Sequence, residues 1–511
     1  MTERPNSPGL KRRDLLVGLG AAAATALAGG AAALPAAAVT SWDMNADVLV
    51  AGSGAAGASA AIEARRAGAE VLLIESLPRF GGSSAMSAGV VYAGGGTALQ
   101  RELGVEDSVE AMFNFISGAG GRHPPLDKIR LYCEQSSAHF DWLVEQGVPY
   151  RAQLASSMTV PMAGESLYFS GCELAWPARE LAQPAPRGHV PVAAGMTGGR
   201  VLMAALLAQV AALGVVMQAE VEGQRLVVGG DGRVLGMEVR VAGERKTIRA
   251  RRGIVLASGG FIHNREMVRN YAPELYDCAV PWGNIGDQGM GINMGIAAGA
   301  AVLRMHQGFA IVPLYPPDAV LSGIVVNAFG QRFVPEDTYY GVLGDAIAYH
   351  QQGRAWLITD QGSKPPALQD DFLQVAQGNT ISDLARELGF PKGALQDSVA
   401  YYNRHAQNAE DPLFRKRPAF LRPLQGPPYR AWDLSVAKSF VPAHTFGGLH
   451  TGLDGEVISS FGEVIPGLYA AGRTSAGLPG APYIASGLSV GDATFFGRRA
   501  GRAAAGGEAA A

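Results

Sequence analysis

The residues whose types and spacing most clearly serve chemistry are the glycines of the stretch 47–75, DVLVAGSGAAGASAAIEARRAGAEVLLIE. Gly52, Gly54 and Gly57 have G-x-G-x-x-G spacing between an apolar, β-branched run and an Ala-rich segment of helical period. The first glycine permits a tight turn, the second lets backbone approach a pyrophosphate, and the third lets helix pack close on strand. Glu75 ends the next apolar run, where a carboxylate can accept both hydroxyls of an adenosine ribose. The stretch predicts a strand–turn–helix–strand unit that binds a dinucleotide at the helix N-terminus.

A second glycine-rich segment, Gly81-Gly82-Ser83-Ser84, follows the acid directly. This arrangement resembles the FAD enzymes of the fumarate reductase and 3-ketosteroid dehydrogenase superfamily, whose second glycine-rich loop folds over the pyrophosphate and ribityl chain. An enzyme that uses NAD only as a soluble cosubstrate has no need of a second cradle at this point. The resemblance implies FAD, bound non-covalently, because residues 81–89 lack the histidine through which membrane-bound fumarate reductases tether theirs.

Further segments extend the resemblance over about residues 46–502. Ala257-Ser258-Gly259-Gly260-Phe261 resembles the ATGGF element of these flavoproteins, and 286–292 resembles their next helix start, with Gln288 where glycine is commoner. The glycine run 90–97 either lines the flavin or is a turn. A helix from Gly487 to Arg499 can point its N-terminus at the flavin pyrimidine, where negative charge collects on reduction. The FAD contacts that the resemblance implies are Gly52, Gly54, Ala55, Ala56, Gly57, Glu75, Ser76, Gly81, Gly82, Ser83, Ser84, Gly89, Val221, Ala257, Ser258, Gly259, Gly472, Leu488 and Ser489.

Two tyrosine-bearing segments bear on the reaction. Soluble fumarate reductases place a proton-shuttling arginine four residues after the glutamate of a stretch resembling Arg332–Glu336, where this chain has tyrosine. They also carry an arginine in the closing loop, and residues 478–487 here contain none. The pattern instead resembles the bacterial 3-ketosteroid dehydrogenases, which have a tyrosine after RF-x-x-E and another four residues before a glycine, as Tyr483 and Gly487 are spaced. The runs GGSSAMSAGVVYAGGGTALQ and EDTYYG favour the Δ4-(5α) type over the Δ1 type.

The resemblance implies a division of roles in this chemistry. A tyrosine with a pKa near ~10 is a poor base toward unactivated carbon, but a ketone polarised by a phenol and a backbone N–H acidifies the neighbouring carbon. Our hypothesis is that Tyr483 and the Gly487 N–H address the ketone, with Ser486 assisting. Tyr339 or Tyr340 then removes the α proton or orients the group that does, and the two roles could be exchanged.

Two other functions remain open at this point. His444-Thr445-Phe446-Gly447-Gly448 resembles the H-T-M-G-G of fumarate reductases, whose histidine touches the substrate carboxylate; alternatively this histidine bonds backbone beside the flavin. An FAD-dependent reductase of an α,β-unsaturated acid, similar to fumarate or urocanate reductases, is therefore the second hypothesis. A flavin-carrying electron-transfer subunit is the third. In the first hypothesis the flavin passes its electrons to a quinone or another redox protein. In the second, the electrons must come from another protein, since no C-x-x-C-H haem motif occurs.

Composition and rhythm indicate the elements that position these residues. The chain has 511 residues, of which 68 are glycine, and strand and helix signals alternate, as in an α/β enzyme with many tight turns. A net charge of −3 offers no basic footprint for nucleic acid, and three dispersed cysteines without a C-x-x-C argue against a zinc site, an iron–sulfur cluster or a disulfide framework. We expect an α/β fold: a discontinuous Rossmann-like FAD-binding domain (44–299 and 437–505) with an inserted α+β cap or catalytic domain (300–436).

The N-terminus is typical of a targeting segment. Lys11-Arg12-Arg13-Asp14-Leu15-Leu16 resembles the twin-arginine export signal, and an uncharged Ala/Gly-rich run follows to Val39. Ala36-Ala37-Ala38 offers an A-x-A cleavage site. The alternative is a single transmembrane anchor, although alanine and glycine are only weakly hydrophobic. We expect residues 1–43 to lie outside the fold, no stable membrane span in the mature chain, and a location in the periplasm or cell envelope, or the cytoplasm if the signal is unused.

Overall fold

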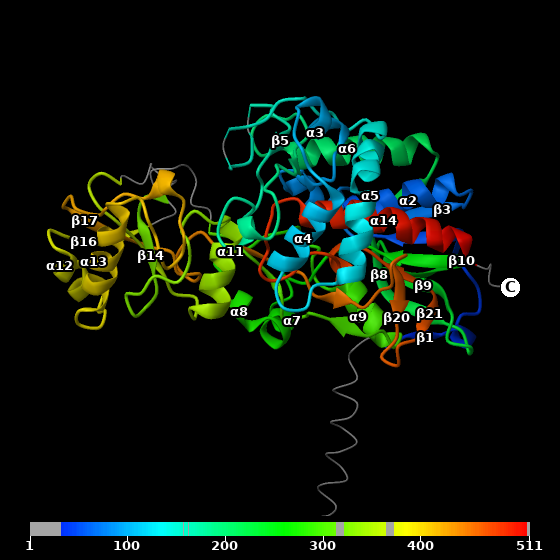
Figure 1. Cartoon of the computed structure of the whole chain (residues 1–511). Helices are drawn as coiled ribbons and strands as arrows, with labels where there is room; N and C mark the ends of the chain where they lie inside the picture. The colour runs from blue at the N-terminus through cyan, green and yellow to red at the C-terminus, as the bar shows by residue number, and fades with distance from the viewer. Residues whose placement is uncertain (1–31, 157, 162, 313–320, 364–372, 508–511) are drawn as a thin grey trace, which may run out of the picture.

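A computed structural model describes residues 32–156, 158–161, 163–312, 321–363 and 373–507. The twin-arginine motif lies outside this part of the chain. The described residues form a large body around a nine-stranded sheet and a smaller body around a four-stranded sheet, which lies at the left of Figure 1. This confirms the predicted α/β fold with an inserted α+β cap. No described helix combines the length and the hydrophobicity that crossing a membrane requires.

The centre of the main sheet is parallel, and it is built by the segments that the glycine motif predicted. β2 (Met44–Ala51) lies between β3 (Val71–Ile74) and β10 (Glu244–Leu256); β7 (Val216–Gln218) pairs with β3, and β21 (Val464–Ala470) with β10. Alternate residues of β2 enter different cores, because successive side chains of a strand point to opposite faces. Val48 and Val50 belong to one buried cluster and Leu49 and Ala51 to another. The sheet is therefore covered on both faces.

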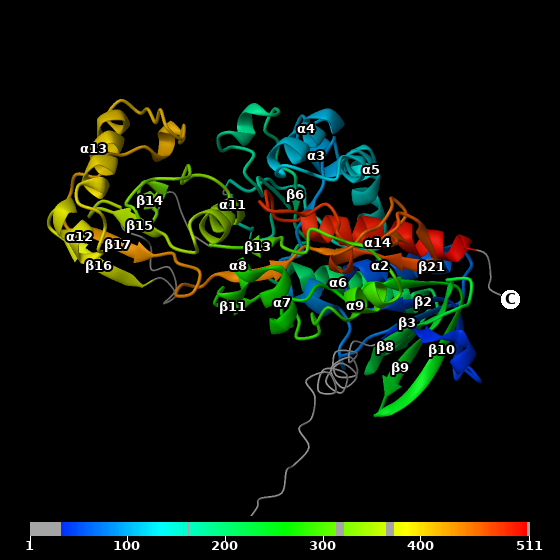
Figure 2. The same cartoon turned by 90° about the horizontal axis from the view of Figure 1, so that it is seen from below.

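Two helices meet over one of these faces. α2 (Ala55–Arg66) follows the glycine turn, and α14 (Leu488–Gly506) closes the chain; they run side by side in Figures 1 and 2. Gly497 and Gly501 permit this approach, because a Cβ at either position would collide with the carbonyl oxygens of Ala56 and Ala60. The contact brings together the beginning and the end of the chain.

An antiparallel extension flanks the parallel strands. β8 (Val221–Val228), β9 (Val234–Val241) and β10 pair in succession, and β20 (Glu456–Ile458) pairs with β21. At the far edge β1 (Leu34–Pro35) pairs with β8, and Asp43 accepts the Thr247 N–H at 2.7 Å. Residues 34–43 thus contact the sheet, which differs from our expectation that the whole segment 1–43 lies outside the fold. The edge of β8 offers unpaired backbone groups, and β1 satisfies some of them.

The cap contains the sheet β14 (Ile324–Val326), β15 (Trp356–Thr359), β17 (Tyr429–Asp433) and β16 (Gln374–Gly378), covered by α12 (Ile381–Glu387) and α13 (Ala394–Ala406). After β14 the chain turns, and Arg332 makes a single bridge back to Val326. The Arg332 guanidinium enters a buried ion cluster with Glu336 and Asp411.

A small sheet of β13 (Gly308–Ala310), β18 (Pro442–Thr445) and β11 (Val280–Pro281) connects the two bodies, and α11 (Tyr340–Asp345) packs on it. The remaining helices, most of which cover the large body, are α3 (Ala98–Glu102), α4 (Val109–Ala119), α5 (Leu126–Glu145), α6 (Gly198–Ala212), α7 (Arg265–Tyr271), α8 (Pro273–Tyr276) and α9 (Met290–Ala297). The remaining strands are β4 (Val91–Tyr92), β5 (Leu167–Tyr168), β6 (Gly188–His189), β12 (Val302–Leu303) and β19 (Gly448–Leu449).

Candidate active site

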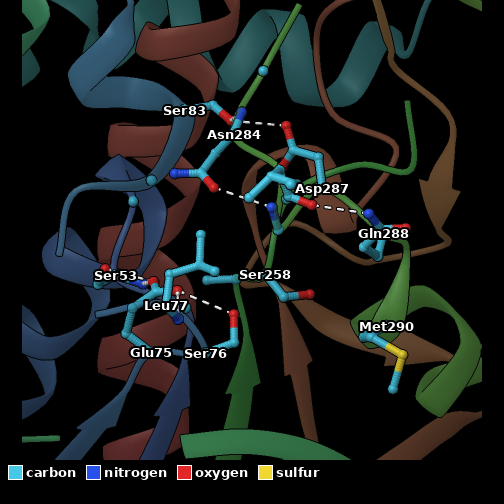
Figure 3. A pocket seen from close by; sticks show the side chains of 18 of the residues that line it. Ser53, Glu75, Ser76, Leu77, Ser83, Ser258, Asn284, Asp287, Gln288 and Met290 are labelled. Carbon is cyan, nitrogen blue, oxygen red and sulfur yellow. Dashed lines mark hydrogen bonds between the residues drawn. The ribbon is translucent and has the colours of Figure 1, made fainter. Parts of the chain in front are cut away.

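A cavity of about 890 Å³ opens at the carboxyl ends of β2, β3 and β10. Figure 3 shows part of its wall, with Glu75, Ser76 and Leu77 on one side and Ser83, Asn284 and Asp287 on another. Most residues that the sequence predicted for the dinucleotide line it. They are Gly52, Gly54, Ala55, Ala56, Glu75, Ser76, Gly82, Ser83, Ser84, Val221, Ala257, Ser258, Gly259, Gly472 and Ser489.

The glycine turn has the geometry that a phosphate cradle needs. Gly52 has φ +107°, and a Cβ there would collide with the Ala257 backbone. Gly54 is the N-cap of α2 and makes no side-chain capping bond, while the next N–H, of Ala55, donates to Ser84 Oγ at 3.0 Å. The positive end of the helix therefore faces the cavity across a wall without bulky side chains.

Glu75 is held at the end of β3 by several donors. One carboxylate oxygen accepts the Ser53 N–H at 3.1 Å and the Ser53 hydroxyl at 2.6 Å, and the other accepts the Leu77 N–H at 3.0 Å. These bonds fix the direction of the carboxylate. Because Glu75 also lines the cavity, it lies where an adenosine ribose would be bound.

Four predicted contacts are not part of the cavity wall: Gly57, Gly81, Gly89 and Leu488. The carbonyl of Gly52 covers Gly57, and the backbone of Gly198 covers Gly89, so close that a Cβ at either glycine would collide. Gly81 donates its N–H to Ser53 Oγ at 3.0 Å, and Leu488 is buried in the core. In this structure these four residues position the cradle instead of lining it.

Asp287 and Arg473 line the cavity and were not singled out from the sequence. Asp287 accepts the Ser83 hydroxyl at 2.7 Å and Arg473 Nη2 at 2.6 Å. Arg473 Nη1 and Ser489 Oγ are buried without a hydrogen-bond partner among the described residues. The only available signal was their place within glycine-rich motifs, G-D-Q-G and A-A-G-R. A glycine cradle, a ribose-binding acid and unpaired polar atoms at the α14 end fit FAD.

A second cluster consists of hydroxyl groups. The Ser486 hydroxyl lies 2.7 Å from the Tyr339 hydroxyl and 2.6 Å from that of Tyr340, and the two tyrosine rings are 4.1 Å apart. Burial raises the pKa of Tyr339 well above its ordinary value. Three of the predicted catalytic residues thus form one hydrogen-bonded cluster, although Ser486 lies more than 140 positions after the two tyrosines in the chain.

Neighbouring backbone holds the loop that bears Ser486. The Ser486 N–H donates to the Ser170 carbonyl at 2.8 Å, and the Ser170 hydroxyl donates to the Ser486 carbonyl at 3.0 Å. Gly487, the N-cap of α14, has φ +102°, and its carbonyl accepts the Tyr92 N–H at 3.1 Å. The positive φ and the close approach of Tyr92 both require glycine here.

Tyr483 lies beside this group but is not hydrogen-bonded to it. Its hydroxyl accepts the Ser489 N–H at 3.1 Å, and its ring packs on Phe309 and Phe446 with centroid distances of 4.6 and 5.1 Å. Burial raises the pKa of Tyr483 to about 12, an effect partly offset by the side chain and the N–H of Ser489 and by the Gly487 N–H. The Tyr483 hydroxyl therefore lies at the N-terminus of α14, next to the cavity wall at Ser489.

Tyr168 of β5 is a further hydroxyl that sequence reasoning missed. It is buried, and its hydroxyl lies near Ser486 without meeting hydrogen-bond geometry. Burial, and secondarily the nearby Tyr340, raise its pKa well above the ordinary value. No motif in the sequence marks it, because its neighbours come from distant segments.

His444 lines the cavity and packs against Phe309 with a ring-centroid distance of 5.0 Å. Burial, and then the Arg473 guanidinium, lower its pKa well below the ordinary value. A neutral imidazole cannot clamp a carboxylate by charge.

Comparisons with known proteins agree with this geometry. The family model described as FAD binding domain matches residues 47–487. The chain is 31% identical over 502 residues to the 3-oxo-5-alpha-steroid 4-dehydrogenase of Comamonas testosteroni, covering 84% of this chain and 93% of that protein. It is 28% identical over 492 residues to the urocanate reductase of Eggerthella lenta, covering 90% and 74%.

A solved structure is more similar still. The 3-ketosteroid-delta4-(5alpha)-dehydrogenase from Rhodococcus jostii RHA1, in complex with 4-androstene-3,17-dione, matches with a TM-score of 0.87 and 40% identity over 93% of this chain and 99% of that one. An open flavocytochrome c3 fumarate reductase matches with a TM-score of 0.65 and 25% identity over 99% and 83%. These findings confirm the resemblance drawn from the sequence. Since the family model spans most of its length and the cavity carries the corresponding cradle, the chain belongs to the FAD binding domain family.

Proposed function

We propose that this protein is an FAD-dependent 3-ketosteroid dehydrogenase that introduces the C4–C5 double bond of a 5α-3-ketosteroid. The observation that carries the proposal is the hydrogen-bonded cluster of the Tyr339, Ser486 and Tyr340 hydroxyls, in which Ser486 precedes Ser489 of the cavity wall by three residues. The similarity to proteins described as steroid 4-dehydrogenases supports the same substrate class. Bound FAD supplies the hydride acceptor.

In this proposal the ketone lies at the N-terminus of α14. The helix dipole and the backbone N–H groups at this end of the helix stabilise negative charge on the ketone oxygen. Tyr483 contributes a phenol at the same place, since its own oxygen is already held by the Ser489 N–H. Polarisation of the ketone acidifies C4, the carbon that must lose a proton.

The cluster of the Ser486, Tyr339 and Tyr340 hydroxyls then takes that proton. A buried phenolate is unfavourable at neutral pH, because burial raises the pKa of Tyr339. A relay avoids this problem: Ser486 accepts the proton from C4 while passing its own proton to the Tyr340 hydroxyl, and Tyr340, which is only partly buried, releases its phenol proton to solvent in the same step. The hydride, which is one proton with two electrons, leaves C5 as the C4–C5 double bond forms. The proton lost from C4 passes along the hydroxyls.

The alternative, reduction of an α,β-unsaturated acid, needs cations for the carboxylate. Among the described residues near the site, His444 favours its neutral form and Arg473 is paired with Asp287. Arg304 donates to the carbonyls of Gly477 and Pro479. These engagements favour the ketone over the acid.

The proposal extends to the cofactor and the cell. FAD is held non-covalently, as the absence of histidine in 81–89 suggests, and trichloroacetic acid should therefore release all the flavin into the supernatant. Electrons pass to a quinone or another redox protein. The twin-arginine segment directs the chain to the periplasm or cell envelope, which N-terminal sequencing of the protein from that fraction would test; an unused signal would leave it in the cytoplasm. The segments 44–299 with 437–505, and 300–436, are proposed as the FAD-binding and cap domains.

Anaerobic bleaching of the flavin tests the reaction. A saturated 5α-3-ketosteroid should bleach the oxidised flavin, whereas a Δ4-3-ketosteroid should not. Bleaching by the Δ4 ketone would place the new bond at C1–C2 instead. If neither steroid bleaches the flavin and fumarate or urocanate reoxidises the dithionite-reduced enzyme, the steroid proposal is wrong.

A further inference from the structure

Glu173 is a buried carboxyl group that the proposed reaction does not use. It is 1% exposed and lies just outside the site. One carboxylate oxygen accepts the Tyr92 hydroxyl at 3.0 Å, and the other accepts the Gly171 N–H at 2.8 Å. A fully buried acid needs such donors, because leaving it unpaired is costly.

Glu173 binds Tyr92 and Gly171, and these two residues belong to the segments that hold the loop 484–487 from either side. On one side, residues 170–172 pair with 484–486: the Cys172 N–H donates to the Ile484 carbonyl at 2.9 Å, and the Ser486 N–H to the Ser170 carbonyl at 2.8 Å. On the other side, the Tyr92 N–H donates to the Gly487 carbonyl at 3.1 Å. One carboxylate thus connects both walls of the loop.

The nearest cation does not neutralise Glu173. Arg187 is buried, and its guanidinium donates to Asp107 at 2.9 and 2.6 Å. Its contact with the Tyr92 hydroxyl is longer, at 3.5 Å. Burial, which dominates, raises the pKa of Glu173 to about 7. The titratable groups that face it from the surrounding elements are Tyr92, Tyr168, Cys172, Arg187 and, beyond the guanidinium, Asp107.

We infer that Glu173 is a positioning residue whose ionised carboxylate aligns Ser486 and Gly487 by holding Tyr92 and Gly171 against the catalytic loop. The inference rests on the proposed function for the role of Ser486. The ionised carboxylate accepts both donors at once. A protonated carboxyl group offers one good acceptor and a competing donor, so one wall of the loop loses its anchor. Catalysis therefore follows the ionised form.

Three variants test the inference in the FAD-loaded protein. Glu173→Gln keeps the shape but leaves a single acceptor, and Tyr92→Phe keeps the carboxylate but removes one donor. Glu238→Gln is the matched control, since this largely buried glutamate accepts Arg225 at 3.1 and 3.0 Å on the distant β8–β9 pair. Flavin content and visible spectrum establish that each variant is loaded.

Hydrogen exchange of the peptide that contains residues 484–487, corrected for the intrinsic pH dependence, is the first measurement. At pH 8, wild type and the Glu238→Gln control should exchange slowly, whereas Glu173→Gln and Tyr92→Phe should exchange fast. Equal protection of this peptide in wild type and both variants would overturn the inference.

Rates of flavin reduction by the 5α-3-ketosteroid are the second measurement. Wild-type kcat should rise through an inflection near pH 7, following the pKa of Glu173. Glu173→Gln should lose the inflection and about ten- to a hundredfold in kcat at pH 8, with KM little changed, as expected for misalignment. A merely structural role would lower thermal stability and leave the pH profile intact. If Glu173→Gln does not fold, Tyr92→Phe alone decides through the exchange of 484–487.

The two proposals fail in different ways. If no steroid reduces the wild-type flavin while the exchange of 484–487 responds as expected, the proposed function is wrong and the positioning role stands. If the steroid reduces the wild-type flavin and the exchange does not respond, only the positioning role is wrong.

Discussion

The buried ion cluster of the cap carries the prediction with the best-defined magnitude. Glu336 is 1% exposed and accepts Arg332 Nε at 2.8 Å, Arg332 Nη2 at 2.7 Å and the Val325 N–H at 3.1 Å. Lys416 Nζ lies 3.3 Å from the same carboxylate. Tyr339 follows Glu336 by three residues. The ion cluster therefore anchors the segment that brings Tyr339 to Ser486.

The effect of removing the charge follows from the pKa. Burial alone would raise the pKa of Glu336, but the charges of Arg332 and Lys416 outweigh it and lower the pKa from 4.5 to about 2. A shift of roughly 2.5 units corresponds to about 3 kcal/mol of stability, which is also the usual effect of breaking a buried ion pair. Because the folded-state pKa is depressed, this stability is present above the unfolded pKa and is lost as pH falls toward 2.

Glu336→Gln should therefore lower the free energy of unfolding by about 3 kcal/mol at pH 7. The variant leaves Arg332 with Asp411 alone and leaves Lys416 buried without its carboxylate; burial already lowers the pKa of that lysine. Urea unfolding followed by the fluorescence of the cap tryptophans Trp356 and Trp432 measures the loss at several pH values. The difference from wild type should shrink as pH falls from 5 toward 3.

Glu110→Gln is the matched control for this experiment. Glu110 pairs with Arg130 at 2.7 Å on the surface, where solvent screens the attraction, and its loss should have a much smaller effect. If Glu336→Gln costs no more than Glu110→Gln, or if its cost does not depend on pH, the reasoning from charge is wrong.

Three further predictions concern the site and its support. Ser486→Ala should reduce the rate of flavin reduction by about a hundredfold or more without changing flavin content, since the two phenols lose their shared partner; stopped-flow absorbance checks this, and an unchanged rate would remove Ser486 from the mechanism. Gly57→Ala should yield protein that retains little FAD, because the new Cβ would collide with the Gly52 carbonyl and displace the cradle; the ratio of flavin to protein absorbance measures it, and full loading would contradict the reasoning. Glu173→Gln should gain thermal stability relative to wild type as pH rises from 5 to 8, because the raised pKa of Glu173 means that wild type loses stability between the ordinary value and about 7; differential scanning calorimetry at both pH values would show a constant difference if this is wrong.

The sequence predicted the parts of the fold that depend on local geometry. The turn at Gly52 needs a positive φ and a close approach of backbone, which only glycine permits. The G-x-G-x-x-G spacing with Gly54 and Gly57 can therefore be recognised in the sequence. The helix α2 was predicted for a similar reason, since its Ala-rich segment has the period of a helix. Much of the cavity wall followed from these elements.

Contacts between distant segments were not predictable in this way. Leu34–Pro35 add a strand to β8 although their composition is that of a targeting segment, because a sheet edge accepts any extended backbone. Asp287 meets Arg473 186 positions away, and Glu173 meets Tyr92 81 positions away. No spacing rule connects such residues.

The sequence by itself therefore determined the dinucleotide cradle, the order of the elements and the set of candidate hydroxyls, because each depends on backbone conformation or on residue type. Only the tertiary structure decided which hydroxyls act together. Ser486 is hydrogen-bonded to Tyr339 and Tyr340, while the Tyr483 hydroxyl accepts the Ser489 N–H at the N-terminus of α14. Tyr168, which the sequence did not predict, lies near Ser486. The physical reason is that a hydrogen bond forms within about 3 Å, and which groups come that close depends on the packing of cap, closing loop and sheet against one another.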